Sequence, residues 1–549
     1  MLNAALIGVL GAAWFIIMYR WYGNVIDRQI IRPSDDVPTP AHTLKDNIDF
    51  MPTQPAILFG HHFSSIAGAG PIVGPMLAYA LFGWLPALLW ILLGSVFIGG
   101  VHDYTAMMIS VRHKGVSIAD IAEQHVSPVA RWIFSVFLWL ALVLVIAVFA
   151  VFTAQTLAQE PAIVVPTLGL MLLAMAFGYG VYRKGMNVWL GTAIALLVLA
   201  ALVVLGNYYP VPASYDFWLV FSLIYCFVAA TLPVWILLQP RDYLSMYLLV
   251  AGLALGFISL LVMHPTINGP AFTGFDSAKG PLWPILFITV ACGAVSGFHS
   301  VVSSGTSAKQ LRKESDGRKV AFGGMLTEGA LAMLVILLMS SVLYWAVPPS
   351  ADVSAFVFQS LLSVKGPNIT FGTAMGKVME HIGIPLVYGT AFGVLMLNAF
   401  ILTTLDTCAR LTRFIVAETA GRKVPVLANR YVATALGLVA AFFLTAGHSG
   451  ETLWPAFGAA NQLIAALSLL VASAYVFGFK RRTAFTLLPG IFMLITTEGA
   501  LFYQLFWLYI PSGNITLGIV AGVLMVLGLV IAFEVYKRFQ RRDPVAVPA

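Results

Sequence analysis

The sequence predicts an all-α protein that crosses a membrane many times, with about 15 transmembrane helices. Three observations lead to this prediction. Of the 549 residues, 60% are hydrophobic and only 10% are charged, whereas roughly a quarter of the residues in a soluble domain are charged. The mean hydropathy is +0.91. Long apolar runs recur along the whole chain, without the alternation typical of membrane β-strands.

The apolar runs are each near the ~20 residues that an α-helix needs to cross ~30 Å of hydrocarbon. They lie at about 2–19, 56–81, 84–110, 131–158, 162–182, 188–206, 217–239, 243–263, 282–305, 322–347, 383–407, 427–446, 453–479, 484–508 and 515–536. The first run could be mistaken for a signal peptide. It lacks a basic start and a small-residue cleavage site, so we expect a retained helix.

The basic residues predict the orientation of the chain. If the N-terminus lies outside, only Lys279, Lys365 and Lys377 of the 30 Lys and Arg residues fall outside. This is the bias that membrane proteins show toward cytoplasmic Lys and Arg, and a miscounted helix would reverse it downstream. The formal charge of +7 is therefore a topology signal and not a sign of a nucleic-acid partner. We expect a cytoplasmic C-terminus.

The runs divide the chain into segments, and none of them is a soluble domain of useful size. We expect an N-terminal helix at 1–20, a Pro-rich cytoplasmic linker at 21–55, a first five-helix repeat at 56–206, a second, inverted five-helix repeat at 217–407, C-terminal helices at 427–536 and a cytoplasmic tail at 537–549. Residues 348–382 form the longest external loop in this scheme.

Two broken helices are the reason for expecting an inverted repeat. In "SSIAGAGPIVGP", Gly68, Gly70 and Pro71 predict unwinding near 67–71, because proline removes a backbone donor. In "YCFVAATLPVWILLQPRDY", Pro233 predicts a related interruption near mid-depth. Discontinuous helices at matching positions of two inverted repeats form the substrate and ion sites of many transporters. Gly and Pro are also simply common in membrane helices, which is the alternative explanation.

Buried ionisable residues in membrane helices are costly, so each is a functional candidate. Counting ~1.5 Å per residue, the inner half of the bilayer receives His61, His62, His102, Asp103, His299 and Glu328. Ser303 and Ser304, beside carbonyls released by a broken helix, suit Na⁺, because hard cations take oxygen ligands. A histidine could instead carry a coupling proton.

Each candidate also has a purely structural explanation. His61 and His62 point about 100° apart, so both can hardly face one ligand. His102 and Asp103 can be a buried structural pair, and Glu328 can neutralise the basic loop 309–319. Asp406 and Glu498 have weaker cases. A metal site is not expected, because no HExxH or CxxC spacing is present and Cys226, Cys292 and Cys408 fit neither a zinc site nor a disulfide framework.

The strings "GHHFSSIAGAGPIVGP", "GGVHDY", "LPVWILLQPRDYL" and "SGFHSVVSSGTSAKQL" resemble the carbon starvation protein A family of bacterial inner-membrane transporters. The resemblance covers about 56–330. It implies a LeuT-type five-plus-five fold and uptake of peptides or pyruvate during carbon starvation. The apolar runs place one helix before the repeats and about four after them. The resemblance places the substrate between the breaks, near Ser64, Ser65, Ala67, Gly68, Gly70, Tyr225, Pro233 and Trp235. A second-cation position would fall between Ala67 and Ser303 and Ser304.

The predicted function is therefore secondary active import by symport with H⁺ or Na⁺ through alternating access. Primary energy coupling is not expected, because no GxxxxGK[ST] phosphate loop is present. We also expect no catalytic residues and no cofactor. A channel is the alternative, although it does not require paired broken helices. A membrane enzyme or sensor that uses the histidines is a further alternative, without a supporting nucleophile and base pattern. The partners are the lipid bilayer and the small substrate, and the sequence does not specify the oligomeric state.

Overall fold

The computed structural model describes residues 3–47, 49–346, 356–446 and 450–541. Parts of the expected loop 348–382 and of the tail 537–549 lie outside these residues. The described chain is almost entirely helical, and a small antiparallel hairpin pairs β1 (Asp276–Ser277) with β2 (Gly280–Pro281).

The helices follow the apolar runs closely. Their bounds are α1 Ala4–Ile26, α2 Pro40–Thr43, α3 Pro55–Ile66, α4 Gly70–Phe82, α5 Trp84–Gly94, α6 Gly100–Arg112, α7 Ile118–His125, α8 Pro128–Gln159, α9 Val164–Lys184, α10 Val188–Tyr208, α11 Tyr215–Thr231, α12 Leu238–Met263, α13 Leu282–Val290, α14 Gly297–Gly305, α15 Gly323–Ser341, α16 Phe358–Met379, α17 Leu386–Thr419, α18 Arg430–Thr445, α19 Gly450–Gly478, α20 Ala484–Tyr503 and α21 Ile515–Arg541.

The expected count of about 15 spans is not confirmed. Within the described residues, 12 helices are long and apolar enough to cross a membrane, and the bent pair α3 and α4 would be the 13th. The two other runs correspond to α11, with 17 residues, and α18, with 16 residues. These two helices are shorter than the ~20 residues of an upright span.

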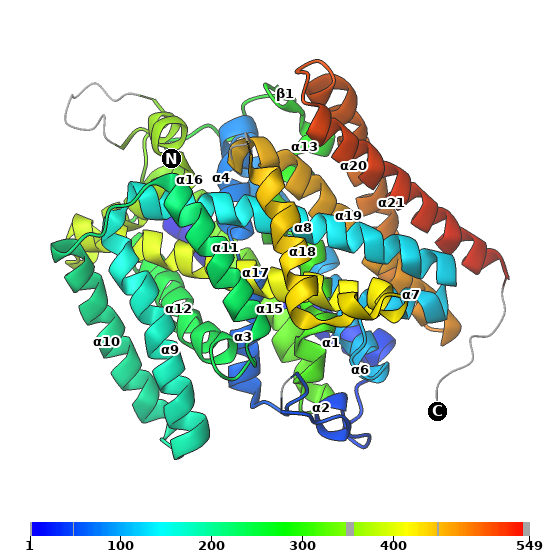
Figure 1. Cartoon of the computed structure of the whole chain (residues 1–549). Coiled ribbons are helices and arrows are strands. Elements are labelled where there is room, and N and C mark those ends of the chain that lie inside the picture. Colours follow the sequence, from blue (N-terminus) through cyan, green and yellow to red (C-terminus); the bar gives the residue numbers. More distant parts are fainter. Residues whose placement is uncertain (1–2, 48, 347–355, 447–449, 542–549) are drawn as a thin grey trace.

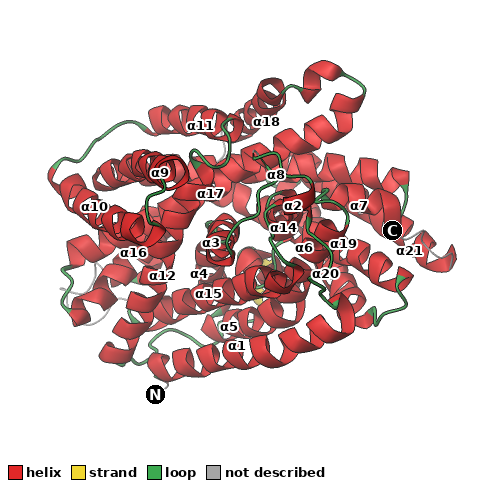
Figure 2. Ribbon diagram, turned by 90° about the horizontal axis from the view of Figure 1, so that it is seen from below, coloured by secondary structure: helices red, strands yellow, loops and turns green. Residues whose placement is uncertain are grey.

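The bundle has a buried centre and an apolar rim. The long helices α8 and α17 pack against each other, and α3 and α14 lie near the centre of the view in Figure 2, while α10 and α21 lie at the edge. Leu197 of α10 is 73% exposed and Ile515 of α21 is 75% exposed. Exposed leucine and isoleucine on peripheral helices are what a hydrocarbon environment favours, because lipid tails are as apolar as these side chains.

The first predicted break is confirmed. Helices α3 and α4 meet at a bend of 40° between Ile66 and Gly70. Pro71 occupies the first turn of α4, where its missing N–H is harmless, and therefore starts a new helix after the break. A Cβ on Gly70 would lie 2.4 Å from the Cys292 side chain, so only glycine permits this close approach.

The second predicted break is in the wrong place. Helix α11 ends at Thr231, and after a short turn the chain enters α12, so Pro233 lies in a connection between two helices. Leu232 is extended (ψ 153°), as the residue before a proline prefers to be. The discontinuous partner is instead the span at 282–305, where Ala291 adopts φ 42° between α13 and α14. No proline stands at that break, so the sequence pattern did not reveal it.

The expected external loop 348–382 also differs from its prediction. Residues Phe358–Met379 form α16, a helix that is kinked at Gly366 (φ 73°) and packs on α17. Its Asn368 amide donates to Thr156 near the end of α8. Because α16 is not continuously apolar, it did not stand out in a search for membrane spans.

Basic loops that are distant in sequence meet on one face, which we call the basic face. Arg481 donates to the Ile31 carbonyl (3.0 Å), and Arg410 pairs with Asp49 (2.9 Å). On the opposite face, the Ala4 amide donates to the Pro265 carbonyl (3.0 Å). In Figure 1 the basic face is at the bottom, near α2 and α6, and the opposite face is at the top, near β1. The segments that were predicted to share a side therefore lie together.

The contact at Gly70 generates a first prediction. Gly70→Ala should lower the free energy of unfolding by about 1–3 kcal/mol, because the new methyl group overlaps the Cys292 side chain. The matched control is Gly518→Ala in the peripheral helix α21, where the nearest atoms to a new Cβ are 3.8 Å away. Thermal unfolding in detergent measures both variants. Equal unfolding temperatures would contradict the close packing of the two breaks.

Candidate functional site

The two helix breaks lie against each other in the centre of the bundle. A Cβ on Gly74 would lie 2.5 Å from the Val290 carbonyl oxygen, and Gly70 faces Cys292. These glycines bring α4 directly onto the break between α13 and α14. Backbone at a break has lost helical hydrogen bonds and must be satisfied by other groups inside a membrane.

Threonines of α17 satisfy carbonyls near the first break. Thr403 donates to the Ser64 carbonyl (2.8 Å), and Thr404 donates to the Ser65 carbonyl (3.1 Å). These two threonines were not predicted from the sequence. At the second break, the Asn461 side-chain oxygen accepts from the Phe298 amide (2.8 Å). Helices α17 and α19 are thus held to the breaks by side chains that replace lost backbone bonds.

The serine pair proposed for Na⁺ lies buried in α14, and its role as a cation site stays a prediction. The Ser304 hydroxyl donates to the Ser300 carbonyl of its own helix (2.7 Å) and accepts from the Ile118 amide (3.3 Å). The Ser303 hydroxyl has no hydrogen-bond partner among the described residues. The hydrogen bonds to the carbonyls beside Ala67 come from Thr403 and Thr404 and not from these serines.

Four predicted residues from three helices form one buried cluster, which we call the His299 cluster: His102, Asp103, His299 and Glu328. Asp103 lies between two imidazoles, 2.8 Å from His102 Nδ1 and 2.8 Å from His299 Nδ1. His299 Nε2 lies 3.1 Å from a Glu328 oxygen. All four side chains are at most 1% exposed. A histidine held between two carboxylates can keep one proton at membrane depth, because each partner stabilises the imidazolium.

The same cluster has the geometry of a compact cation site. Ligand atoms of Cys292, His299 and Glu328 lie within 4.8 Å of one another. Apart from the contact with His299, neither Glu328 carboxylate oxygen has a hydrogen-bond partner among the described residues. Cys292 is engaged by Asn461, whose Nδ2 lies 3.3 Å from its sulfur atom. The ligands come from three separate segments, so no local spacing in the sequence could have indicated this grouping.

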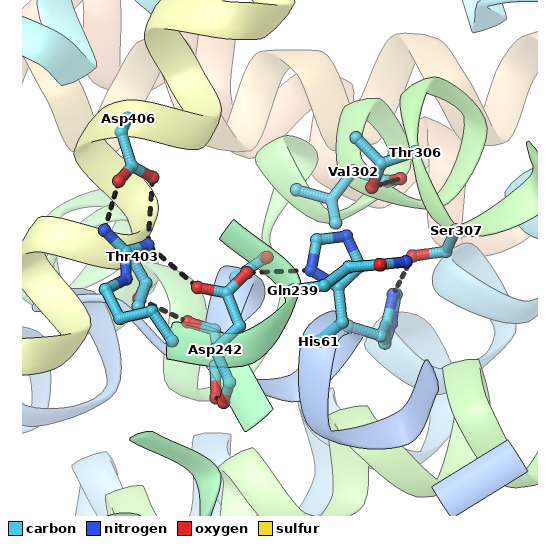
Figure 3. Close-up of polar contacts among 12 residues, drawn as sticks. His61, Gln239, Asp242, Val302, Thr306, Ser307, Thr403 and Asp406 are labelled. Carbon is cyan, nitrogen blue, oxygen red and sulfur yellow. Dashed lines mark hydrogen bonds and ion pairs between the residues drawn. The ribbon is translucent and has the colours of Figure 1, made fainter. Parts of the chain in front are cut away.

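The adjacent histidines His61 and His62 serve different partners, as their angular separation on a helix requires. His62 Nδ1 lies 2.8 Å from the Ser307 hydroxyl. His61 Nδ1 lies 2.7 Å from Asp242, and Figure 3 shows this contact. The Nε2 atoms of both rings are buried without a partner in the described part of the chain.

Asp242 connects His61 to a second buried cluster, which we call the Arg241 cluster: His61, Tyr225, Arg241, Asp242 and Asp406. Arg241 pairs with Asp242 (2.8 Å) and contacts Asp406 through both terminal nitrogens. The Tyr225 hydroxyl donates to Asp406 (3.0 Å). Sequence reasoning missed Arg241 and Asp242 and ranked Asp406 low. The signal that could have revealed them is the adjacent pair of opposite charges in "QPRDYL", which lies within helix α12.

Three residues expected to line the substrate site come from α11 and from the turn that follows it. Of these, Tyr225 joins the Arg241 cluster. Pro233 and Trp235 lie in the turn, and the Arg183 guanidinium sits 5.0 Å from the centre of the Trp235 ring. The structure therefore brings Tyr225, but not Trp235, to the predicted layer of polar residues.

A large cavity lies away from the breaks, on the basic face. Its volume is about 700 Å³, and its lining includes Arg112, His113, His125, Glu314 and Tyr475. His113 and His125 face each other with their Nε2 atoms 2.8 Å apart. Burial lowers the pKa of His125 to about 4, and His113 adds to this effect. Burial also lowers the pKa of His113.

This pair generates a prediction about pH. Because the pKa of His125 is about 4 when folded and about 6.5 when unfolded, the unfolded chain binds the extra proton first. The contribution of neutral, buried His125 to the stability of the fold should be present above pH 6.5 and be lost as the pH falls toward 4. Thermal unfolding across this range should show a weaker pH dependence in His125→Gln. The control is the exposed His42→Gln, and an equal change in both variants would contradict the prediction.

Comparisons with known proteins identify the chain. The family described as carbon starvation protein CstA matches residues 3–500. A peptide transporter CstA of Bacillus subtilis is 32% identical over 99% of this chain and 98% of its own length. The pyruvate/proton symporter BtsT of Escherichia coli is 31% identical over 92% of this chain and 82% of its own length.

Among solved structures, a manganese transporter of Eremococcus coleocola is similar at a TM-score of 0.48 and 11% identity, over 91% of this chain and 99% of that chain. The match to the family model extends over most of the chain, including both breaks and both buried clusters. The chain therefore belongs to the carbon starvation protein CstA family, and it is a multi-pass secondary transporter and not an enzyme.

Proposed function

We propose that this chain imports pyruvate or peptides together with protons across a bacterial inner membrane. One observation carries the proposal: two broken helices meet beside a buried chain of histidines and carboxylates. The relatives named as a peptide transporter and as a pyruvate/proton symporter support these substrates and this coupling ion. Pyruvate and a peptide C-terminus share a carboxylate, so one site chemistry serves both.

The His299 cluster supports proton coupling over Na⁺ coupling. His299 is flanked by Asp103 and Glu328, so a proton on its ring is stabilised from both sides. A Na⁺ site at the first break would need free backbone oxygen ligands there. The carbonyls of Ser64 and Ser65 at the break already accept hydrogen bonds from Thr403 and Thr404.

We infer a five-plus-five inverted repeat whose second unit starts later than the sequence pattern indicated. The first unit runs over about residues 55–208 and the second over about 282–478, and α11 and α12 lie between them. Each unit opens with a broken helix. In this correspondence, the span of α5 and α6 matches α15, and the lateral helix α7 matches α16. The long helix α8 matches α17, α9 matches α18, and α10 matches α19.

The lengths and faces of these helices support the inferred correspondence. The paired long helices have 32 and 34 residues and pack against each other. A π-helical turn occurs in both second spans, at Ser95–Gly99 and at Arg318–Phe322. Because α3 starts at the basic face and α13 at the opposite face, the units have opposite topology, as alternating access by inverted repeats requires.

The orientation follows from charge. We propose that the basic face is cytoplasmic, since Lys and Arg accumulate on the cytoplasmic side of inner-membrane proteins. The N-terminus then lies outside and α21 ends in the cytoplasm. A cysteine placed at the exposed Val37, in the linker at the basic face, should react with an impermeant maleimide only after the membrane is opened. Labelling of intact cells would contradict this orientation.

Transport in proteoliposomes tests the proposed function. An imposed H⁺ gradient should drive accumulation of labelled pyruvate or of a labelled dipeptide above the level reached without a gradient. A Na⁺ gradient imposed alone should not. Accumulation driven by Na⁺ alone would reverse the choice of coupling ion. Equilibration without accumulation would indicate a channel.

Variants of the His299 cluster test the proton site. His299→Gln should abolish H⁺-driven accumulation or shift its pH profile, because the ring then binds no proton. Ser303→Ala combined with Ser304→Ala should leave H⁺-driven uptake intact. If Na⁺ is the coupling ion, the same double variant should instead abolish the stimulation of uptake by Na⁺. Unchanged pH profiles in His299→Gln and Glu328→Gln would remove this cluster from the mechanism.

A further inference from the structure

The charges around Arg241 do not balance unless a proton is present. Arg241 is 2% exposed, and its two carboxylate partners, Asp242 and Asp406, are fully buried. From the neighbouring helices, His61 of α3, Tyr225 and Cys226 of α11 and Asp406 of α17 face this group. Two ionised aspartates against one guanidinium leave one negative charge, and one proton bound to the cluster would cancel it. An uncompensated charge in the membrane interior is strongly unfavourable.

Asp406 occupies the position that a carboxylate ligand would take on Arg241. It contacts both terminal nitrogens of the guanidinium, which is the forked arrangement that any carboxylate prefers. The Arg241 Nε is buried without a hydrogen-bond partner in the described residues, so the side chain keeps an unused donor. A substrate carboxylate and Asp406 would therefore compete for the same fork.

The Arg241 cluster is also tied to the first helix break. The Ser64 hydroxyl donates to the Asp242 carbonyl (2.8 Å), and the Ser64 carbonyl accepts from Thr403, which lies just before Asp406 on α17. Figure 3 shows Thr403, Asp406, Asp242 and His61 converging from their three helices. A change of partner at Arg241 would therefore act on the segment that begins the break.

A cavity lined in part by arginines lies along the part of α17 that follows Asp406. It has a volume of about 240 Å³, and its lining includes Pro233, Arg410 and Arg413. Arg410 follows Asp406 by one helical turn, is 1% exposed, and donates to the Leu232 carbonyl (3.0 Å). Its own Nε is buried without a partner in the described part of the chain.

We propose that Arg241 binds the carboxylate of the substrate and that Asp406 holds the guanidinium until a proton neutralises Asp406. The proton binds to a carboxylate oxygen of Asp406, the ion pair with Asp406 opens, and the substrate carboxylate forms the new ion pair. No covalent bond changes. The anion and the proton enter together because the charge of the cluster then stays constant. This inference rests on the proposed function and names the residues that recognise its substrate.

Binding measurements at different pH values test the inference directly. For purified wild-type protein in detergent, the Kd for pyruvate should rise with pH by up to about tenfold per unit, the limit for one linked proton. Asp406→Asn mimics the protonated residue, so it should bind pyruvate with little pH dependence. It should also retain exchange of pyruvate across the membrane and lose H⁺-driven accumulation. The control Glu498→Gln replaces a partly buried carboxylate of the peripheral helix α20 and should keep the wild-type pH dependence.

A second pair of variants separates recognition from folding. Arg241→Gln removes the fork but leaves Asp406 without its partner, so it is combined with Asp406→Asn to restore the charge. The double variant should unfold near the wild-type temperature and bind pyruvate at least 100-fold more weakly than Asp406→Asn alone.

The outcomes distinguish this inference from the proposed function. Wild-type binding that is independent of pH, or normal pyruvate binding by the double variant, would overturn the role of Arg241 and Asp406, even if H⁺-driven uptake by the wild type is intact. If the wild type itself shows no H⁺-driven uptake, the proposed function would be overturned instead. Binding of pyruvamide, which has no carboxylate, with an affinity like that of pyruvate would also contradict recognition by Arg241.

Discussion

The direct contact between the two helix breaks is the constraint on which the rest of the structure depends. Gly70 and Gly74 lie so close to Cys292 and the Val290 carbonyl that any side chain would prevent the contact. Breaking a helix at membrane depth also leaves backbone groups without partners, and lipid offers none. Thr403, Thr404 and Asn461 supply them. The long helices α17 and α19 are thus positioned by the need to satisfy the breaks.

Two buried charge clusters flank this contact and follow the same logic. In each, a carboxylate is shared between two cationic or titratable partners: Asp103 between two histidines, and Asp242 between His61 and Arg241. Removing one partner would leave an unpaired charge in a medium that solvates it poorly. Because the partners come from different helices, any movement of α3 or α14 against α12, α15 or α17 must rearrange these contacts. Movement of the broken helices and movement of charge are therefore coupled physically.

The differences from the sequence-based expectations have local causes. Proline predicted the first break correctly because Pro71 can begin the helix that follows it. Pro233 lies two residues after the end of α11, in the turn that leads to α12, so it does not mark a break within one span. The true second break, at Ala291, relies on small residues and close packing and not on proline. Helix α16 was missed because it lies along α17 and needs no continuous apolar run.

The sequence by itself determined the class of protein, the approximate spans, the side that carries the basic residues and the list of buried ionisable candidates. These depend on composition and on local order along the chain, which the hydrophobic effect and helix periodicity convert into structure. Only the tertiary structure decided which candidate meets which. His61 and His62 are neighbours, yet they join different partners because they point to different faces of α3. Arg241 and Asp406 are 165 residues apart and become partners because α12 and α17 pack together, which no local pattern encodes.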